Sequence, residues 1–311
     1  MADANIGAPV RILFASETEK AEFWLPLLRQ ALPQDEFLSV AEGKIDVALV
    51  ATPPAGTLGK LKGVKLIQSL WMGVEKLLAD PGLPKGVPIA RCIDPGMVAA
   101  MSESVVAHVL DWHRHHYRYR KQQAEKQWRR RKQYLASDRV VGILGMGELG
   151  SDAARKLRAL GFNVAGFSRR PKELPGVKSY TELAPMLKIT DALVCLLPLT
   201  KETRGILNGR HLALLRKYGC LINLARGGHL VLPDLLHELD SGHLAHAYLD
   251  VFDTEPLPAS DPLWHHPHVT VTPHSAALTE PRTALPKIAE NIERVRRGET
   301  PHHLVDFAAG Y

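Results

Sequence analysis

Three glycines spaced G-x-G-x-x-G, Gly145, Gly147 and Gly150, constrain the fold more than any other feature of the chain. A short apolar run at 140–144 precedes them, and a helical pattern follows. In this context the first glycine permits a tight turn, the second lets the backbone approach a pyrophosphate, and the third lets the helix pack closely on the strand. The helix then presents unpaired N–H groups to the phosphates. The stretch predicts a dinucleotide-binding loop made of Gly145, Met146, Gly147, Glu148, Leu149 and Gly150.

The rest of the chain alternates apolar strands with helical segments. Its 311 residues exceed one ordinary core, so two domains are expected. Near-continuous apolar strands separated by helices are typical of parallel sheets covered on both faces. We therefore predict an α/β fold with two doubly wound parallel-sheet domains, a Rossmann cofactor domain and a smaller flavodoxin-like domain. Strands of the cofactor domain are expected at 140–144, 163–167, 192–197, 220–224, 246–251 and 269–272.

The region before the glycine loop supplies the smaller domain. Its strands are expected at 10–16, 45–51, 64–70 and 87–93. A helix follows the first of these strands, and Pro26 is expected to delay its start. A last helix at 286–297 is expected to return to this domain.

The N-terminus and the cysteines indicate a compartment. Met1-Ala-Asp-Ala-Asn5 has no basic region followed by an apolar core, so no secretory signal is expected. No apolar run approaches the roughly 20 residues that cross a bilayer. Cys195 and Cys220 fall in predicted buried strands, where a small apolar side chain is their expected role. These features predict a cytoplasmic protein without membrane contact.

The net charge of +6 is concentrated in one segment, residues 114–132, with nine Lys or Arg and Glu125 as its one acidic residue. The segment is expected to continue a long helix at 101–119 and to end in a linker near 134–138. Interleaved aromatic residues such as Trp128 can stack on bases. A solvated helix or dimer arm is the preferred interpretation, and no nucleic-acid partner is expected. The histidine clusters show no metal-ligand spacing, so no metal is expected.

The end of the second cofactor-domain strand indicates which dinucleotide binds. A carboxylate at this point would hydrogen-bond the ribose 2′-hydroxyl of NAD. The chain instead has Ser168, Arg169 and Arg170. Guanidinium groups bind phosphate oxygens in a bidentate fork. We therefore predict a preference for NADP(H), with NAD(H) possible if the arginine pair is ordinary surface.

Arg226, Glu255 and His274 each follow a predicted strand, at the edge where open α/β sheets bind ligands. Reduction of a 2-oxo acid requires a proton at the carbonyl oxygen, and a histidine supplies protons near neutral pH. Glu255 would orient the ring and favour its imidazolium form, and Arg226 would stabilise the developing negative charge. The structural alternatives are an ion pair for Arg226, a loop position for Glu255 and a solvent-facing or capping role for His274.

On these motifs the chain resembles the D-isomer-specific 2-hydroxyacid dehydrogenase family. The resemblance covers nearly the whole chain and includes Leu197-Pro198-Leu-Thr200, Asn223-Leu-Ala-Arg226-Gly, Asp250-Val-Phe-Asp-Thr-Glu255-Pro and Thr272-Pro-His274. Within the family it is most similar to the bacterial glyoxylate/hydroxypyruvate reductase branch, through residues 101–112, Ser168-Arg-Arg and the terminal Gly310-Tyr311.

The resemblance implies Arg226, Glu255 and His274 as the catalytic triad, and a homodimer. It implies a substrate domain formed by 1–100 and 275–311, and a dinucleotide-binding domain at 101–274. Further cofactor contacts are expected at Leu197, Pro198, Thr203, Leu224, Ala225, Arg226, Asp250 and His274.

Substrate contacts are expected at Trp71, Met72, Gly73, Arg226 and His274, with backbone N–H groups of 69–74 binding the substrate carboxylate. The family usually has small residues before this glycine and Asp after the following valine. This chain has Trp71-Met72 before Gly73 and Glu75 after Val74. The bulky pair would reshape the pocket or simply pack in the core.

Three functions fit these features. The first is NADPH-dependent reduction of small 2-oxo acids, glyoxylate and hydroxypyruvate, with His274 as the proton donor. The second is the same chemistry on a bulkier keto acid of the phenylpyruvate kind. The third is a dinucleotide-sensing protein of the corepressor kind, against which the intact triad argues.

Overall fold

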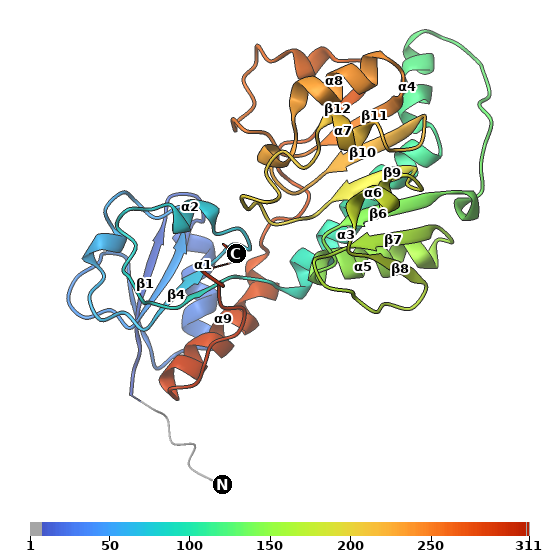
Figure 1. Cartoon of the computed structure of the whole chain (residues 1–311). Coiled ribbons are helices and arrows are strands. Elements are labelled where there is room, and N and C mark those ends of the chain that lie inside the picture. The colour runs from blue at the N-terminus through green and yellow to red at the C-terminus, as the bar shows by residue number, and fades with distance from the viewer. Residues whose placement is uncertain (1–7, 309, 311) are drawn as a thin grey trace. The chain divides into compact units, whose positions relative to one another are not determined.

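The computed structural model of the chain describes residues 8–308 and Gly310. Met1–Asn5, where no secretory signal was expected, and Tyr311 lie outside the described residues. The chain divides into two compact units, a first unit of Met1–Met97 with Thr279–Tyr311 and a second unit of Val98–Leu278. Figure 1 shows blue N-terminal and red C-terminal segments together in the first unit.

The first unit is built on a five-stranded parallel sheet. Its strands are β1 (Arg11–Ser16), β2 (Glu36–Leu38), β3 (Val47–Ala51), β4 (Leu66–Ser69) and β5 (Ile89–Ala90). They are ordered β2-β1-β3-β4-β5, the flavodoxin-like order. The predicted architecture is confirmed. Sequence reasoning missed β2, a three-residue edge strand.

Successive side chains of β1 point to opposite faces of this sheet, and each face packs in its own apolar cluster. Ile12 and Phe14 pack into one cluster with residues of α1 (Ala21–Ala31) and α9 (Pro281–Arg296). Leu13 and Ala15 pack on the opposite face, against Leu58 of the 3₁₀ helix η1 (Leu58–Lys60), and α2 (Glu75–Leu78) contributes Leu77 there. Figure 1 shows α1 and α9 beside the sheet of the first unit. The last helix therefore returns to the first unit.

Two helix starts differ from the prediction. Pro26 lies inside α1, which begins at Ala21, so the proline does not delay the helix. Pro26 has no N–H to donate to the Glu22 carbonyl, so it removes one intrahelical hydrogen bond, and the helix nevertheless continues to Ala31. The last helix begins at Pro281 instead of 286, because the Glu280 side chain accepts the N–H of Arg282 and caps it.

The second unit holds a seven-stranded parallel sheet. Its strands are β6 (Val140–Leu144), β7 (Asn163–Phe167), β8 (Val177–Tyr180), β9 (Ala192–Cys195), β10 (Gly219–Asn223), β11 (Leu244–Leu249) and β12 (Val269–Val271). Their order is β12-β11-β10-β9-β6-β7-β8. Strands β7 and β8 are added on one side of β6, and β9 to β12 are added on its other side, so the strand order switches between β6 and β9. That switch point is where doubly wound sheets bind dinucleotides.

Helices of the second unit connect these strands. They are α3 (Pro95–His113), which begins in the first unit, α4 (His116–Ala124), α5 (Glu148–Ala159), α6 (Leu183–Leu187), α7 (Gly209–Leu212) and α8 (Leu232–Asp240). Short 3₁₀ helices occur at η2 (Ala136–Asp138), η3 (Gly227–His229) and η4 (Pro262–His265). Each predicted strand is present, but β8 was missed. β9 ends two residues earlier than expected, β11 lies two residues earlier, and β10 and β12 differ by one residue.

The prediction of one long helix at 101–119, continued by the basic segment, is wrong. The helix stops at His113, and His115 adopts a left-handed backbone with φ 61° before α4 begins. Beyond α4 the basic segment has no regular structure and runs back along it. The Gln122 side chain donates to the carbonyl of Arg129, 2.8 Å away, and the N–H of Arg131 donates to the Tyr119 hydroxyl, 3.2 Å away.

The three cysteines are free and buried, as expected for Cys195 and Cys220. Burial raises the pKa of the Cys92 and Cys195 thiols to about 12. Among the described helices, none combines the length and apolar character needed to cross a bilayer.

Candidate active site

The glycine loop has the backbone that a dinucleotide requires. Gly145 has φ 99°, and a Cβ there would lie 2.7 Å from the carbonyl oxygen of Leu196. A Cβ on Gly150 would overlap the carbonyl oxygen of Gly145. A Cβ on Gly147, at the N-cap of α5, would meet nothing within 4 Å. The outer glycines are therefore required by close packing, whereas Gly147 faces open space that a pyrophosphate can approach.

Two apolar side chains of this region, those of Met146 in the loop and Leu149 in the first turn of α5, point into the protein. Met146 is buried and packs against Gly166, where a Cβ would lie 2.6 Å from the Met146 sulfur. Its carbonyl accepts the Ser151 hydroxyl at 3.1 Å. Leu149 is also buried. These side chains support the loop, and its backbone N–H groups are the ones left to face a ligand.

Ser168, Arg169 and Arg170 follow β7 directly. The Ser168 hydroxyl donates to the carbonyl of Arg170 at 2.7 Å, which bends the chain there. Both arginines are exposed. A hydrogen bond from the Thr200 hydroxyl is the largest of the effects that lower the pKa of Glu202, and the positive charge of Arg169 lowers it further. The guanidinium of Arg169 therefore lies within electrostatic reach of the loop after β9.

The other expected cofactor residues line the ends of β9 and β10. The Thr203 hydroxyl donates to the carbonyl of Pro198 at 2.7 Å and accepts the N–H of Thr200 at 2.8 Å. These bonds fold the loop after β9 back on itself and fix Leu197 and Pro198. Leu224 and Ala225 are buried at the end of β10.

Glu255 and His274 meet in the structure. The Nδ1–H of His274 donates to the Glu255 Oε2 at 2.7 Å, and the Glu255 Oε1 accepts the N–H of Phe252 at 2.8 Å. A carboxylate accepts hydrogen bonds, so Nδ1 carries a proton and Nε2 remains for proton exchange. The side chains of His274 and Glu255 are 48% and 34% exposed, so the pair is open to a substrate.

Asp250 holds the turn that carries His274, a role that sequence reasoning missed. Its buried carboxylate accepts the Thr272 hydroxyl at 2.6 Å and the N–H groups of Ser275 and Ala276 at 2.9 and 3.0 Å. Its carbonyl accepts the N–H of His274 at 2.8 Å. His274 has φ 51°, a left-handed backbone that is uncommon outside glycine and is stabilised here by these bonds.

Arg226 follows β10, next to the Glu255 loop. A Cβ on Gly227 would overlap the backbone of Phe252, so this glycine lets the two loops meet. Buried Asn223 donates to the carbonyl of Arg226 at 3.1 Å. The ring nitrogens of fully buried His229 lie 3.1 and 3.2 Å from the carbonyls of Arg226 and Pro198. Neither supporting residue was predicted, because burial after the strand end is not visible in the sequence.

The expected substrate loop of the first unit follows β4. The N–H of Trp71 donates to the Ser69 hydroxyl at 3.0 Å, so it is occupied. Within the described residues, the N–H groups of Met72, Gly73 and Val74 have no acceptor. Three successive unpaired N–H groups are suited to a carboxylate. The described residues contain no cluster of three potential metal ligands.

Comparison with known proteins agrees with this geometry. Residues 106–276 match the family model of the D-isomer specific 2-hydroxyacid dehydrogenase, NAD binding domain. The chain is 44% identical to the glyoxylate/hydroxypyruvate reductase A of Serratia proteamaculans and 41% identical to that of Photorhabdus laumondii. Each alignment covers 97% of this chain and 100% of the relative.

Solved structures are similar over the same length. A D-isomer specific 2-hydroxyacid dehydrogenase from Xanthobacter autotrophicus, in complex with NADPH and MES, is 38% identical with a TM-score of 0.93, covering 98% of this chain and 100% of that one. An NADPH-dependent glyoxylate/hydroxypyruvate reductase from Sinorhizobium meliloti, in complex with NADP and sulfate, is 37% identical with a TM-score of 0.91, covering 97% and 100%.

Proposed function

Because the chain belongs to the D-isomer specific 2-hydroxyacid dehydrogenase family, we propose that it reduces glyoxylate and hydroxypyruvate to 2-hydroxy acids with NADPH. The observation that carries this proposal is the 2.7 Å bond between His274 and Glu255, at the carboxyl edge of a nucleotide-binding sheet. The two curated reductases, at 41–44% identity, support the substrate class.

The residues present fit NADPH. The open space at Gly147 and the N–H groups that begin α5 suit the pyrophosphate. The exposed guanidinium groups of Arg169 and Arg170 suit the 2′-phosphate. When bound, the reduced nicotinamide supplies a hydride to the substrate carbonyl carbon.

Each residue of the triad has a separate task. His274 delivers the proton from Nε2 to the carbonyl oxygen, and Glu255 stabilises the imidazolium and fixes its orientation through Nδ1. The Arg226 guanidinium stabilises the negative charge that develops on the carbonyl oxygen. Asp250 acts through the turn that it holds, as a positioning residue. We assign the substrate carboxylate to the unpaired N–H groups of 72–74, which makes the first unit the substrate domain.

Alanine variants test the proposal. Arg226→Ala and His274→Ala should lower kcat with glyoxylate by at least about 100-fold, because each loses a group that acts in the transition state. NADPH binding, measured by fluorescence, should persist and report folding. Arg210→Ala and His265→Ala, at exposed positions of the same unit, are matched controls. Near-normal turnover in either triad variant would overturn the assignment.

We also propose a cytoplasmic homodimer. Trp128 is 96% exposed and Leu135 is 71% exposed in the segment that follows α4. A second copy covering them would remove two large apolar side chains from water. Light scattering should give twice the chain mass, and Trp128→Ser should shift it toward the monomer. A monomeric natural chain would contradict the proposal.

A further inference from the structure

A cavity of about 140 Å³ opens in the first unit, at the carboxyl ends of β3 and β4. Its lining includes Thr52, Pro53, Ser69, Trp71, Gly73 and Lys76. Cavities of about this size hold a benzene ring. Gly73 belongs both to this lining and to the run of unpaired N–H groups assigned to the substrate carboxylate. The cavity is therefore adjacent to the expected position of the substrate's first carboxylate.

The indole of Trp71 forms a fixed wall of this cavity. Its Nε1–H donates to Glu19 Oε1 at 2.8 Å, and Glu19 Oε2 accepts the Nε1–H of Trp24 at 3.0 Å. Trp24 is fully buried, and the N–H of Glu19 is held by the Ser16 hydroxyl at 2.7 Å. Because Glu19 is itself held by Trp24 and Ser16, it fixes the orientation of the Trp71 indole. The cavity beside the indole is therefore present without a ligand.

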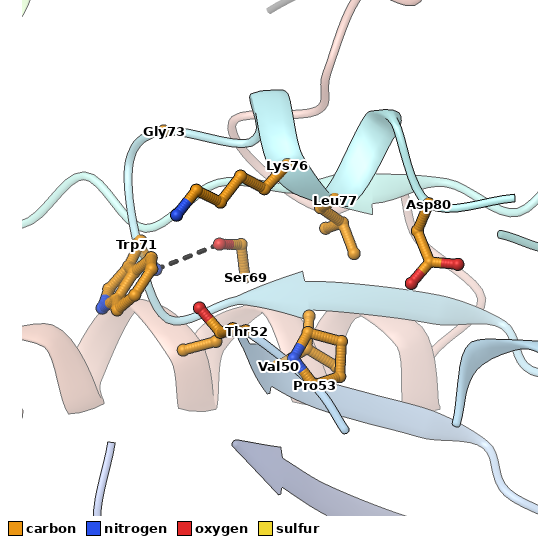
Figure 2. Close-up of a pocket in the computed structure, with 10 residues that line it drawn as sticks. Val50, Thr52, Pro53, Ser69, Trp71, Gly73, Lys76, Leu77 and Asp80 are labelled. Carbon is orange, nitrogen blue, oxygen red and sulfur yellow. Dashed lines mark hydrogen bonds between the residues drawn. The ribbon is translucent and has the colours of Figure 1, made fainter. Parts of the chain in front are cut away.

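One end of the cavity is positively charged. Figure 2 shows the Lys76 ammonium and the Ser69 hydroxyl extending toward the same space above Trp71 and Thr52. Within the described residues Lys76 has no acidic partner, and Ser69 is buried with its hydroxyl hydrogen uncommitted. Asp80 lines the other end, and its Oδ1 accepts the N–H of Gly82 at 2.7 Å. The cation, the hydroxyl and the indole wall are together at the end near Gly73.

Resting on the proposed function, we propose that this cavity binds the substrate side chain and that Lys76 binds a second carboxylate at its end. The chain would then prefer 2-oxo acids with a distal carboxylate over uncharged ones of the same length. Thr52 supports a ligand role, because this β-branched residue has φ 44°, and such strain is concentrated at binding sites. Lys76 is exposed, so a distal carboxylate would replace water at its ammonium, whereas a purely apolar side chain would gain no charged contact there.

Paired substrates test the inference. Initial rates with NADPH give kcat/KM for oxaloacetate against 2-oxobutyrate, and for 2-oxoglutarate against 2-oxopentanoate. Each pair matches the carbon chain and differs in the distal charge. We expect the dicarboxylate to be preferred by about 10-fold in at least one pair, the lower end of the effect of one charged hydrogen bond, because Lys76 is exposed. Lys76→Met should remove that preference, and Lys76→Arg should retain it.

Lys62→Met is the matched control, because Lys62 is an exposed cation of the same unit outside the cavity lining. It should leave the preference intact, which excludes a general effect of net charge. An unchanged preference in Lys76→Met, or a greater kcat/KM for phenylpyruvate than for either dicarboxylate, would overturn the inference. Reduction of glyoxylate with no dicarboxylate preference would refute this inference alone. Failure with every 2-oxo acid would refute the proposed function.

Discussion

Replacing Glu255 by glutamine tests the catalytic pair with almost no change of shape. The two carboxylate oxygens accept from different donors, the Nδ1–H of His274 and the N–H of Phe252. Glutamine has one acceptor oxygen and one NH₂ group, which only donates. If its oxygen faces His274, its NH₂ meets the N–H of Phe252. If it is flipped, the NH₂ meets Nδ1. In the first case the Phe252 bond is lost. In the second case both bonds form only with the histidine tautomer that is protonated at Nε2, which is not the tautomer that pairs with Glu255. In both cases the negative charge beside the imidazolium is lost.

The size of the effect follows from this loss. A hydrogen bond to a charged group contributes about 1.5–3 kcal/mol, which corresponds to roughly 10- to 150-fold in rate. Stability should change much less, because the side chains of Glu255 and His274 are 34% and 48% exposed. Exposed pairs contribute about 1 kcal/mol or less to the free energy of unfolding.

The assay compares kcat for hydroxypyruvate with Tm for the natural chain, Glu255→Gln and Glu255→Asp. Asp253→Asn, an exposed carboxylate two residues earlier, is the control and should retain normal turnover. We expect kcat to fall at least about 10-fold in Glu255→Gln with little change in Tm. A Glu255→Gln variant with more than half of the natural kcat would refute the role assigned to the pair.

Three further predictions concern the cofactor site and stability. Gly147→Ala should raise the Kd for NADPH about 10-fold and change the free energy of unfolding by about 1 kcal/mol or less. Gly150→Ala should lower the free energy of unfolding in urea by about 1–3 kcal/mol, because its Cβ would overlap the Gly145 carbonyl. Equal stability of the two variants would contradict the packing argument. Changing Arg169 and Arg170 together to serine should raise the KM for NADPH about 100-fold with little change for NADH, and a parallel rise for both would assign the pair to the surface. Burial lowers the pKa of His246 to about 3, so the unfolded chain takes up a proton below about pH 6.5 that the folded chain does not. The free energy of unfolding should therefore be about 2 kcal/mol lower at pH 5 than at pH 7 from this residue, and His246→Gln should flatten the dependence; an unchanged slope would contradict this.

The sequence predicts those parts of the fold in which local pattern and burial agree. The apolar runs of β6, β7 and β10 and the glycine spacing were sufficient, because each is a short-range signal. Two of the edge strands were missed, since β2 has only three residues and β8 places Lys178 and Ser179 in solvent. The break between α3 and α4 depends on the left-handed backbone of His115, whose ring bonds the carbonyl of Lys132 at 3.0 Å, a contact between distant residues.

Some residues of the candidate site could likewise be identified from the sequence, and others depend on tertiary structure. Glu255 and His274 were identified because imidazole and carboxylate after strand ends are unusual and chemically informative. Asp250, Asn223 and His229 act through burial and through bonds to backbone groups, which depend on tertiary structure. The cavity beside Lys76 depends on the orientation of Trp71, which Glu19 sets from 52 residues away.

We propose above that the chain is an NADPH-dependent reductase of small 2-oxo acids. The most direct test is the initial loss of absorbance at about 340 nm with glyoxylate or hydroxypyruvate, comparing NADPH with NADH at equal concentration. We expect fast oxidation of NADPH and a much slower rate with NADH. No oxidation of either cofactor with these substrates would contradict it.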